Sequence, residues 1–521
     1  MTLDPLLPPV LIPLLAALCC LLLPAGWQRE RGWLAVGATA ATLLAVWPVF
    51  LGDNRELAWG GWLLLRVDPL SRLVLLAAAV FALLIAIYSL GYFQGAERIS
   101  PRRAGGDQTD WLSDGRSAGW AAGDLGGPRI YEACLLGSLA FTCGVLLAGE
   151  LLLLVICWGL LAVTLYLMIG LTGPDASEAA RKTFLIVGGA DTLLLLGSGL
   201  LWFQHGSTRL DAAAVHLDSA TGYLAFFCFL SAAFAKAGAV PFHSWLPDCG
   251  EKAHAPVTAY LPAALDKLLG VYLLVRIARD WFVMTDAMYT LLMFFGAVTI
   301  LGGAMMAIVQ SDLKRLLSYC AVSQVGYILL GIGTGTPLGL VAGLFHMLNH
   351  AIYKSCLFLV AGVVQQKAGE VDLDRLGGLA TRLPMTFCTC LVASLAVSGI
   401  PPFNGFASKW MVYQAIIESG QQEGGSLWVF WLATAMFGSA LTLAIIVKML
   451  HSVFLCKPSP QIRQRSIQRA GWSEVVPLAL LSGLCLLFGV FAMAVPLRWF
   501  ILPAVSEPVI FHGTWWAGQA S

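Results

Sequence analysis

Charged residues are scarce in this chain. Lys, Arg, Asp and Glu make up 12% of its 521 residues, whereas 58% are hydrophobic. That composition excludes a water-soluble globular protein, because apolar runs of about 20 residues, long enough to cross a bilayer as helices, recur along the whole length. The net charge of +1 gives no electrostatic basis for binding nucleic acid. We therefore expect an all-α polytopic membrane protein that contacts lipid and no nucleic acid.

Motifs for redox and nucleotide chemistry are also missing from the sequence. There is no P-loop and no G-x-G-x-x-G that opens a helix after a strand, so we expect neither ATP nor NADH to react on this chain. The 13 cysteines form no C-x-x-C pair and no iron–sulfur spacing. We therefore predict no cofactor, no metal and no catalytic residue in this chain. Whether it forms part of an enzyme depends on its partners.

The apolar runs predict about fourteen transmembrane helices. They lie near 5–24, 32–51, 69–92, 131–149, 151–172, 183–203, 222–243, 256–277, 288–309, 316–333, 337–364, 385–411, 427–455 and 475–495. The longest polar interruption, 94–130, is predicted to be a loop. Most of the loop lysines and arginines follow odd-numbered spans. We expect the chain to lie in the plasma membrane. The positive-inside rule then places those loops on the cytoplasmic side and both termini outside.

Five lysines lie inside predicted spans, and these are Lys236, Lys267, Lys354, Lys409 and Lys448. A charge at mid-bilayer costs about 2.5–3.5 kcal/mol even on lenient scales, so it is retained where it faces a polar interior. A buried lysine also changes its pKa readily. The lysines therefore indicate a protein that handles protons. Lys448 lies towards the end of its span, where snorkelling explains it equally well.

An internal repeat surrounds two interrupted spans. Residues 231–248 read SAAFAKAGAVPFHSWLPD and residues 394–410 read SLAVSGIPPFNGFASKW, with Pro241-Phe242 aligned to Pro402-Phe403. Paired broken helices in two halves point to a transport site, and we place the breaks at Pro241, Pro401 and Pro402. The copies lie five spans apart, an odd offset that inverts one copy relative to the other.

This repeat divides the chain into four predicted regions. Residues 1–130 form an N-terminal three-helix region with a cytoplasmic loop, and 131–277 form the first inverted five-helix repeat, helices 4 to 8. Residues 288–455 form the second repeat, helices 9 to 13, and 456–521 hold the last helix and the tail.

The first interrupted span carries a motif that resembles the antiporter-like subunits of respiratory complex I. Mrp-type cation/proton antiporters and the membrane arms of energy-converting hydrogenases share that family. The matching motifs, within roughly residues 130–455, are Lys236-x-x-x-x-Pro241-Phe242-His243-x-Trp245-Leu246-Pro247-Asp248, Gln310-x-Asp312-Leu313-Lys314-Arg315, Phe345-His346-x-x-x-His350-Ala351-x-x-Lys354 and Gly399-Ile400-Pro401-Pro402-x-x-Gly405-Phe406-x-Ser408-Lys409.

The resemblance implies proton translocation along a file of side chains. It makes Lys236 the central proton carrier of the first half-channel and Lys267 the relay towards the second half. It makes Lys409 the exit carrier. Between Lys267 and Lys409 it continues the path through three residues of one span, His346, His350 and Lys354. Their spacing of i, i+4 and i+8 also places them on one face of one helix.

One position departs from the family pattern. Where the family has Trp-Glu, with the glutamate paired to the first lysine, this chain has Trp158-Gly159. An unpaired buried ammonium is costly, so we expect another acid to approach Lys236. The candidates are Asp191, Glu150 and Asp266. We favour Asp191, because it lies at mid-span beside two glycines that permit close helix approach. Asp266 is the least expected.

These features favour a proton-translocating membrane subunit of a redox-driven complex, of the NADH:quinone oxidoreductase or membrane-bound hydrogenase type. The redox chemistry would belong to peripheral partner subunits, beside further membrane subunits. The alternatives are a Mrp-type Na⁺/H⁺ antiporter subunit, the membrane subunit of an inorganic-carbon uptake system, and a structural subunit whose first half-channel has decayed. Intramembrane acids are scarce, which weakens the sodium alternative. The retained lysines argue against decay.

Overall fold

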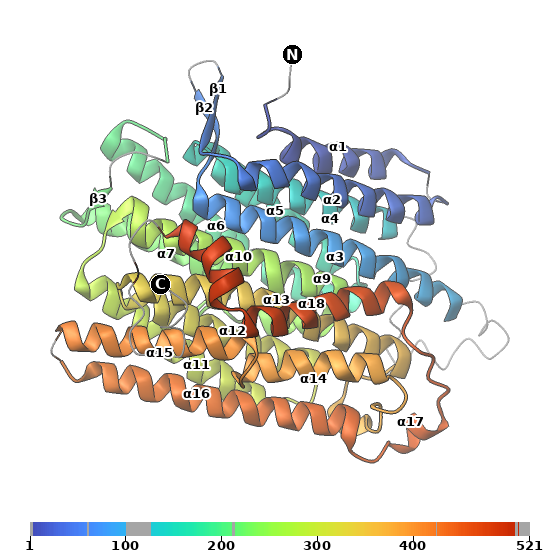
Figure 1. Cartoon of the computed structure of the whole chain (residues 1–521). Helices are drawn as coiled ribbons and strands as arrows, with labels where there is room; N and C mark the ends of the chain where they lie inside the picture. Colours follow the sequence, from blue (N-terminus) through green and yellow to red (C-terminus); the bar gives the residue numbers. More distant parts are fainter. Residues whose placement is uncertain are drawn as a thin grey trace.

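The computed structural model describes residues 4–24, 26–59, 62–99, 127–210, 214–423, 425–505 and 509. Its long helices run roughly parallel or antiparallel in one bundle (Figure 1). Eleven helices among the described residues are long and apolar enough to cross a membrane, and three shorter apolar helices accompany them. An all-α polytopic membrane fold is therefore confirmed.

Each predicted span coincides with a helix or an interrupted helix. The helices are α1 (Pro8–Leu22), α2 (Gln28–Leu51), α3 (Pro69–Ile99), α4 (Gly127–Leu147), α5 (Leu151–Gly170), α6 (Ser177–His205), α7 (Ala220–Ala237), α8 (Trp245–Lys252), α9 (Ala255–Tyr260), α10 (Asp266–Val275), α11 (Asp286–Ile308), α12 (Leu313–Gly333), α13 (Pro337–Ala368), α14 (Pro384–Ser398), α15 (Asn404–Glu423), α16 (Leu427–Leu450), α17 (Pro460–Gln464) and α18 (Trp472–Val490).

Short 3₁₀ and π-helical turns complete the helical part. The 3₁₀ turns are η2 (Pro174–Ala176), η5 (Leu373–Arg375) and η8 (Leu502–Ala504), and the π-helical turns are η3 (Leu261–Leu265), η4 (Arg276–Trp281), η6 (His451–Leu455) and η7 (Met493–Ile501). Turn η3 joins α9 to α10, so the predicted span 256–277 is one helix with a π-helical interruption. Such interruptions frequently accompany functional sites.

Two small sheets lie outside the all-α expectation. Strands β1 (Arg55–Trp59) and β2 (Trp62–Val67) pair antiparallel, and β3 (Val215–His216) pairs parallel with β4 (Phe282–Val283). All four strands lie between helices, where the hydropathy pattern only predicts loops. The loop predicted at 94–130 is also too long, because α3 continues to Ile99 and α4 begins at Gly127. Residues 100–126 of that loop lie outside the described residues.

The two predicted breaks share one backbone pattern. Helix α7 ends at Ala237 and is followed by Gly238, with φ +71°, and by a cis Val240–Pro241 bond. Helix α14 ends at Ser398 and is followed by Gly399, with φ +79°, and by a cis Pro401–Pro402 bond. Both glycines adopt the left-handed conformation that favours glycine at a helix C-terminus. The aligned sequences therefore fold alike locally, while the inverted five-helix repeats stay a prediction.

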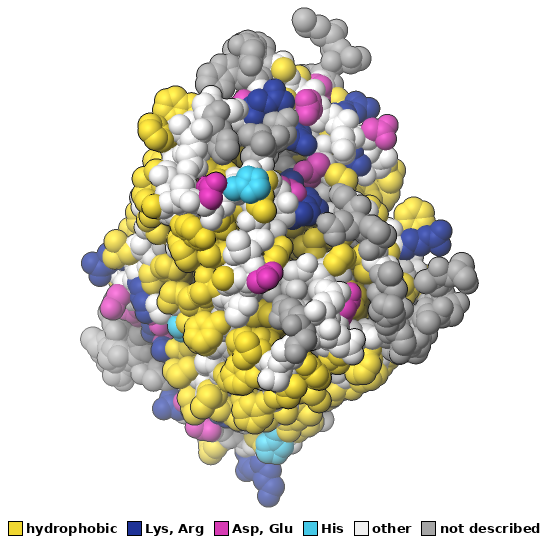
Figure 2. All heavy atoms as spheres, turned by 90° about the vertical axis from the view of Figure 1, so that its left-hand side faces the viewer, with side chains coloured by type: hydrophobic (Ala, Val, Ile, Leu, Met, Phe, Trp, Pro, Cys, Tyr) yellow, Lys and Arg dark blue, Asp and Glu magenta, His cyan; other side chains and the backbone are white. Residues whose placement is uncertain are grey.

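The polar interior is built around α13. This helix is buried along nearly its whole length and packs against α10, α12, α14, α15 and α18. Figure 2 views the end of the bundle that carries the β1–β2 hairpin, where hydrophobic side chains cover much of the surface and charged side chains lie between them. The lysines predicted as carriers are absent from the surface, because their side chains are buried in the interior of the bundle.

Candidate functional site

The four lysines and two histidines predicted as proton carriers all lie buried in the interior of the bundle. Their exposed fractions are 2% or less, and they come from α7, α10, α13 and α15. They are Lys236, Lys267, Lys354, Lys409, His346 and His350. All six residues that the sequence predicts as proton carriers therefore belong to one buried region.

Lys236, in the last turn of α7, lies between a carboxylate and an aromatic ring. Its Nζ is 3.9 Å from Oδ1 of Asp266 and 4.9 Å from the ring centre of Trp158. The Nζ also contacts the Trp158 carbonyl oxygen at 3.5 Å. The indole Nε1 of Trp158 donates to Oδ1 of Asp191 at 2.8 Å. One tryptophan therefore separates Lys236 from a second buried acid.

The sequence-based ranking of the acidic partners is wrong. Asp266 makes the ion pair with Lys236, whereas Asp191 reaches it through Trp158. The π-helical turn η3 immediately before Asp266 changes the direction in which α10 presents its first residues. Glu150 lies at the N-terminus of α5, where it accepts a hydrogen bond from the Thr208 hydroxyl. It is therefore held by a loop, not by Lys236.

Lys267 follows Asp266 directly but points to a different partner. Its Nζ donates to the carbonyl oxygen of Ala237, the last residue of α7. Helix C-termini present unpaired carbonyls and a partial negative charge, both of which favour a cation. Helix α10 approaches α7 closely here, since a Cβ added at Gly270 would lie 2.5 Å from the backbone nitrogen of Ala237.

Lys409 repeats this arrangement at the second break. Its Nζ donates to the carbonyl oxygen of Val397 at 3.0 Å, in the last turn of α14. On its other side it lies 4.7 Å from the ring centre of Tyr327. At both breaks, therefore, a buried lysine from a following helix caps the carbonyl end of the helix that stops.

Helix α13 spans the distance between these two lysines. His346 Nδ1 is 2.9 Å from the Ser408 hydroxyl on α15, and its Nε2 is 3.3 Å from the Tyr353 hydroxyl. Lys354 Nζ contacts the Leu317 carbonyl oxygen at 3.4 Å. Neither nitrogen of His350 makes a hydrogen bond of good geometry in the described part of the chain, although the ring interacts with the backbone of Ala321. A buried imidazole needs such bonds, so a water molecule fits this position.

Electrostatic interactions connect the carriers across helices. His350 interacts with Lys267 on α10 as well as with His346 and Lys354 on its own helix. Lys409 in turn interacts with Lys354 and with His346. The file of titratable groups therefore runs from α10 through α13 to α15 without a gap in electrostatic contact.

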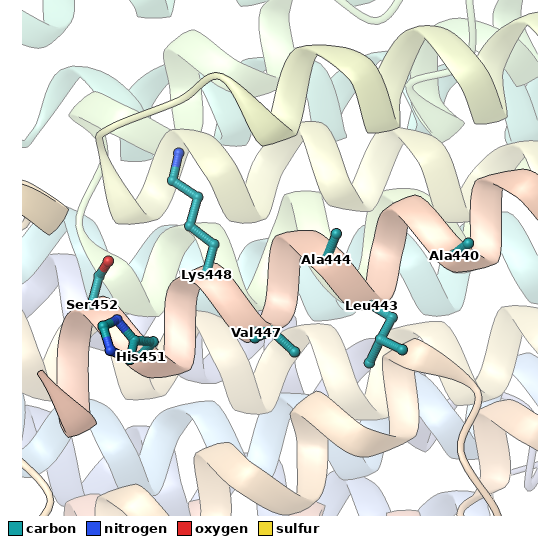
Figure 3. A pocket seen from close by; sticks show the side chains of 7 residues that line it. All are labelled: Ala440, Leu443, Ala444, Val447, Lys448, His451 and Ser452. Atoms are coloured by element: carbon teal, nitrogen blue, oxygen red, sulfur yellow. The ribbon is translucent and has the colours of Figure 1, made fainter.

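Lys448 does not belong to this group. Its Nζ donates to the carbonyl oxygens of Ile308 and Gln310, both at 2.8 Å, and so caps the C-terminal end of α11. It points away from Leu443 and Val447 (Figure 3). Lys448, Leu443 and Val447 all border an open pocket of about 600 Å³ on α16 and η6, and none of the six predicted carriers lines this pocket.

Two aromatic residues that were not predicted as functional contact the carriers. Trp158 links Lys236 to Asp191, and the ring of Tyr327 contacts both Lys409 and His346, the latter with ring centres 5.5 Å apart. An aromatic residue in an apolar helix gives no sequence signal that distinguishes such a contact from ordinary core packing.

Curated relatives come from several kinds of membrane complex. A probable K(+)/H(+) antiporter protein of Rhizobium meliloti (strain 1021) is 34% identical over 371 residues, which cover 70% of this chain and 36% of the relative. The N subunit of NADH-quinone oxidoreductase from Desulforudis audaxviator (strain MP104C) is 31% identical over 474 residues, 87% and 86% of the two chains. Hydrogenase-4 component B of Escherichia coli (strain K12) is 28% identical, covering 82% of this chain and 62% of the relative.

Solved structures show the same architecture. A chain of the Mrp complex from Dietzia sp. DQ12-45-1b superposes with a TM-score of 0.80 and 25% identity, covering 98% of this chain and 53% of that chain. A chain of respiratory complex I from Thermus thermophilus gives a TM-score of 0.71 with 22% identity, covering 94% and 98%, and shows the fold alone.

The family that the motifs suggested is confirmed. Several relatives are considerably longer than this chain, which spans between 36% and 62% of the Rhizobium meliloti and Escherichia coli proteins. Residues 148–452, more than half of the chain, match the family described as NADH:quinone oxidoreductase/Mrp antiporter, TM. The chain is a multi-pass integral membrane protein and belongs to this family.

Proposed function

We propose that this chain conducts protons through the membrane as one antiporter-like member of a multi-subunit complex. The observation that carries the proposal is the buried ion pair between Lys236 and Asp266, beside a lysine that caps the broken helix α7. A buried charge is expensive, and four such lysines in one electrostatically connected region have no structural explanation as good as proton transfer.

The pair Lys236–Asp266 supplies the switch. A lysine in a low-dielectric site holds its proton more tightly beside a carboxylate than away from one. At 3.9 Å the pair is held by charge more than by a hydrogen bond, so a small helix movement changes the interaction strongly. Opening the pair releases a proton from Lys236 towards Lys267, and closing it favours uptake of the next proton.

The transferred proton continues through α13. It passes from Lys267 to a water beside His350, from there to Lys354, and on through the His346–Ser408 pair to Lys409. Each of these groups can accept a proton in one step and donate one in the next. The two breaks let α7 and α14 end inside the membrane, where their carbonyls hold Lys267 and Lys409 in position.

We infer the kind of partner and of driving reaction from the names of the relatives. The main candidate is a redox-driven complex, as for the NADH-quinone oxidoreductase and hydrogenase relatives. The second candidate is a cation/proton antiporter assembly, supported by the names of the Rhizobium meliloti relative and of the Mrp complex. In either case we place the chain in the plasma membrane beside other membrane subunits, with both termini outside. Peripheral redox subunits belong to the first candidate.

The alternative of a structural subunit with a decayed first half-channel was based on the absence of a glutamate at position 159, where this chain has Gly159. Asp266 supports the opposite conclusion, because it supplies a carboxylate to Lys236 from another helix. The three relatives described above are an antiporter subunit, a hydrogenase component and an NADH-quinone oxidoreductase subunit, so they do not support the alternative of an inorganic-carbon uptake system.

The test uses everted membrane vesicles that contain the complete chain with its native partners. Proton uptake is followed with a fluorescent pH probe while the vesicles receive NADH, hydrogen, or an imposed Na⁺ or K⁺ gradient. We expect Lys236→Ala to abolish proton uptake and the exposed control Lys457→Ala to leave it unchanged, at equal levels of assembled complex. Uptake that survives in Lys236→Ala would refute the proposal, and the effective driver selects between the two candidates.

A further inference from the structure

The ring of Tyr327 lies at the far end of the proton file. It contacts Lys409 on α15, with Nζ 4.7 Å from the ring centre, and His346 on α13, with ring centres 5.5 Å apart. Tyr327 itself comes from α12 and is fully buried. It is therefore one side chain that touches two predicted carriers from two different helices.

The hydroxyl of Tyr327 begins a chain of three hydroxyl groups. Its oxygen is 2.9 Å from the hydroxyl of Ser439 on α16, and Ser439 is 2.6 Å from the hydroxyl of Tyr413 on α15. Either atom can be the donor in each of these bonds. Tyr413 and Ser439 are partly exposed, so the chain leads from the buried carriers towards the edge of the bundle.

Helix α16 is shaped to admit the Tyr327 hydroxyl. A Cβ added at Gly438 would lie 2.9 Å from that hydroxyl and 2.1 Å from Cγ2 of Ile300. The hydroxyl also donates to the carbonyl oxygen of Ala435 at 2.8 Å. Tyr327 therefore has two acceptors on α16, Ala435 and Ser439, and its proton can point to either of them.

Tyr413 lies one helical turn beyond Lys409 on α15, towards the end where α15 and α16 meet (Figure 1). A carboxylate follows on the same helix. Oε2 of Glu418 is buried and has no hydrogen-bond partner among the described residues. Buried polar atoms are rarely unpaired, so this oxygen indicates a position where a water or a passing proton is received.

From this geometry we infer that Tyr327, Ser439 and Tyr413 carry protons between Lys409 and the end of the bundle near Glu418. This inference rests on the proposed function and names the path on the far side of its last lysine. None of the three residues belongs to the motifs on which the family resemblance was based.

The transfer balances at each step. The Lys409 ammonium gives a proton, through one water molecule, to the Tyr327 oxygen and becomes a neutral amine. Tyr327 passes its own proton to Ser439, Ser439 passes its own to Tyr413, and Tyr413 gives its own to a water molecule. One proton leaves and no hydroxyl stays ionised. All three hydroxyl groups then rotate back, Tyr327 to its starting bond with Ala435, and the chain is ready for the next proton.

The experiment removes single hydroxyl groups and keeps the rings. Tyr413→Phe, Tyr327→Phe and Ser439→Ala are compared with the wild type in the same vesicles. Matched controls are Tyr223→Phe, at a partly exposed tyrosine of α7, and Ser482→Ala, whose hydroxyl donates to the carbonyl oxygen of Ala479 within α18. We expect at least a tenfold lower rate of proton uptake in the three chain variants, wild-type rates in both controls, and recovery in Ser439→Thr, which restores a hydroxyl.

A second readout separates proton transfer from packing. Replacing H₂O by D₂O should slow the residual flux of Tyr413→Phe more strongly than it slows the wild type, because the broken chain makes proton transfer limiting. If wild-type vesicles transport protons while Tyr413→Phe and Ser439→Ala match them, this inference is overturned and the proposed function stands. Wild-type vesicles that transport no protons would instead refute the proposed function.

Discussion

Lys236 and Asp266 form a buried ion pair whose charged atoms are 3.9 Å apart. Both side chains are 2% exposed or less, and the second oxygen of Asp266 has no hydrogen-bond partner among the described residues. A buried pair gains most when its remaining lone pairs are also satisfied, and this pair lacks that support. It is therefore held loosely, as a switch requires.

Asp266→Asn should lower proton uptake at least tenfold. The amide keeps the shape of the side chain but removes the charge that responds to Lys236. Asp191→Asn should cost less, about two- to fivefold, because Asp191 interacts with Lys236 without forming an ion pair with it, and a charge effect falls off with distance. Uptake rates of the two variants, at equal amounts of assembled complex, decide the order. A larger loss in Asp191→Asn would restore the ranking made from the sequence.

The spans and the breaks could be predicted from the sequence for a simple physical reason. A bilayer has no polar groups to satisfy a peptide backbone, so it imposes long apolar helices that hydropathy detects. The interruptions at Pro241 and Pro402 could be found because proline cannot continue a helix and because the two copies align. The strands β1 to β4 were missed because short pairs between helices leave no comparable pattern.

The partner of Lys236 could not be predicted in the same way. Depth along a span can be read from the sequence, and depth favoured Asp191 over Glu150. The direction in which Asp266 points depends instead on the π-helical turn η3, which rotates α10 relative to α9. Hydropathy carries no information on such a turn. The same limit applies to Tyr327, whose contact with Lys409 depends on the packing of α12 against α15.

Two glycines near the site should respond oppositely to alanine. In Gly270→Ala the new Cβ would lie 2.5 Å from the backbone nitrogen of Ala237, and overpacking of this kind typically costs about 1–3 kcal/mol. In Gly159→Ala the new Cβ meets nothing within 4 Å, and replacing a helical glycine gains about 0.5–1 kcal/mol. Thermal unfolding of the purified complex should therefore shift down for Gly270→Ala and up for Gly159→Ala. Equal shifts would contradict the close approach of α7 and α10.

The ion pairs of Glu251 predict a dependence of stability on pH. Burial raises the pKa of this carboxyl, but hydrogen bonds from Lys252 and Arg315 outweigh burial and hold the pKa below its ordinary value. A carboxyl with a lowered folded-state pKa stabilises the fold above its unfolded pKa of about 4.3 and loses that contribution as the pH falls further. Glu251→Gln should therefore lower the melting temperature at pH 7 and have a smaller effect near pH 3. An equal effect at both pH values would exclude the ionic contribution.

Substitutions of Lys448 and Lys409 should distinguish a lysine that only caps a helix from a lysine that carries protons. Lys448 donates to two carbonyls at the C-terminal end of α11, one in its last residue and one just beyond it, and hydrogen bonds to charged groups contribute about 1.5–3 kcal/mol. Lys448→Met should therefore destabilise the complex by a similar amount and keep at least half of the proton uptake of each assembled complex. Lys409→Met should abolish uptake, because methionine carries no proton although its side chain fills a similar volume. Uptake is normalised to the assembled complex, and unfolding is followed by tryptophan fluorescence. If Lys448→Met assembles with wild-type stability but does not take up protons, Lys448 belongs to the path and the site extends onto α16.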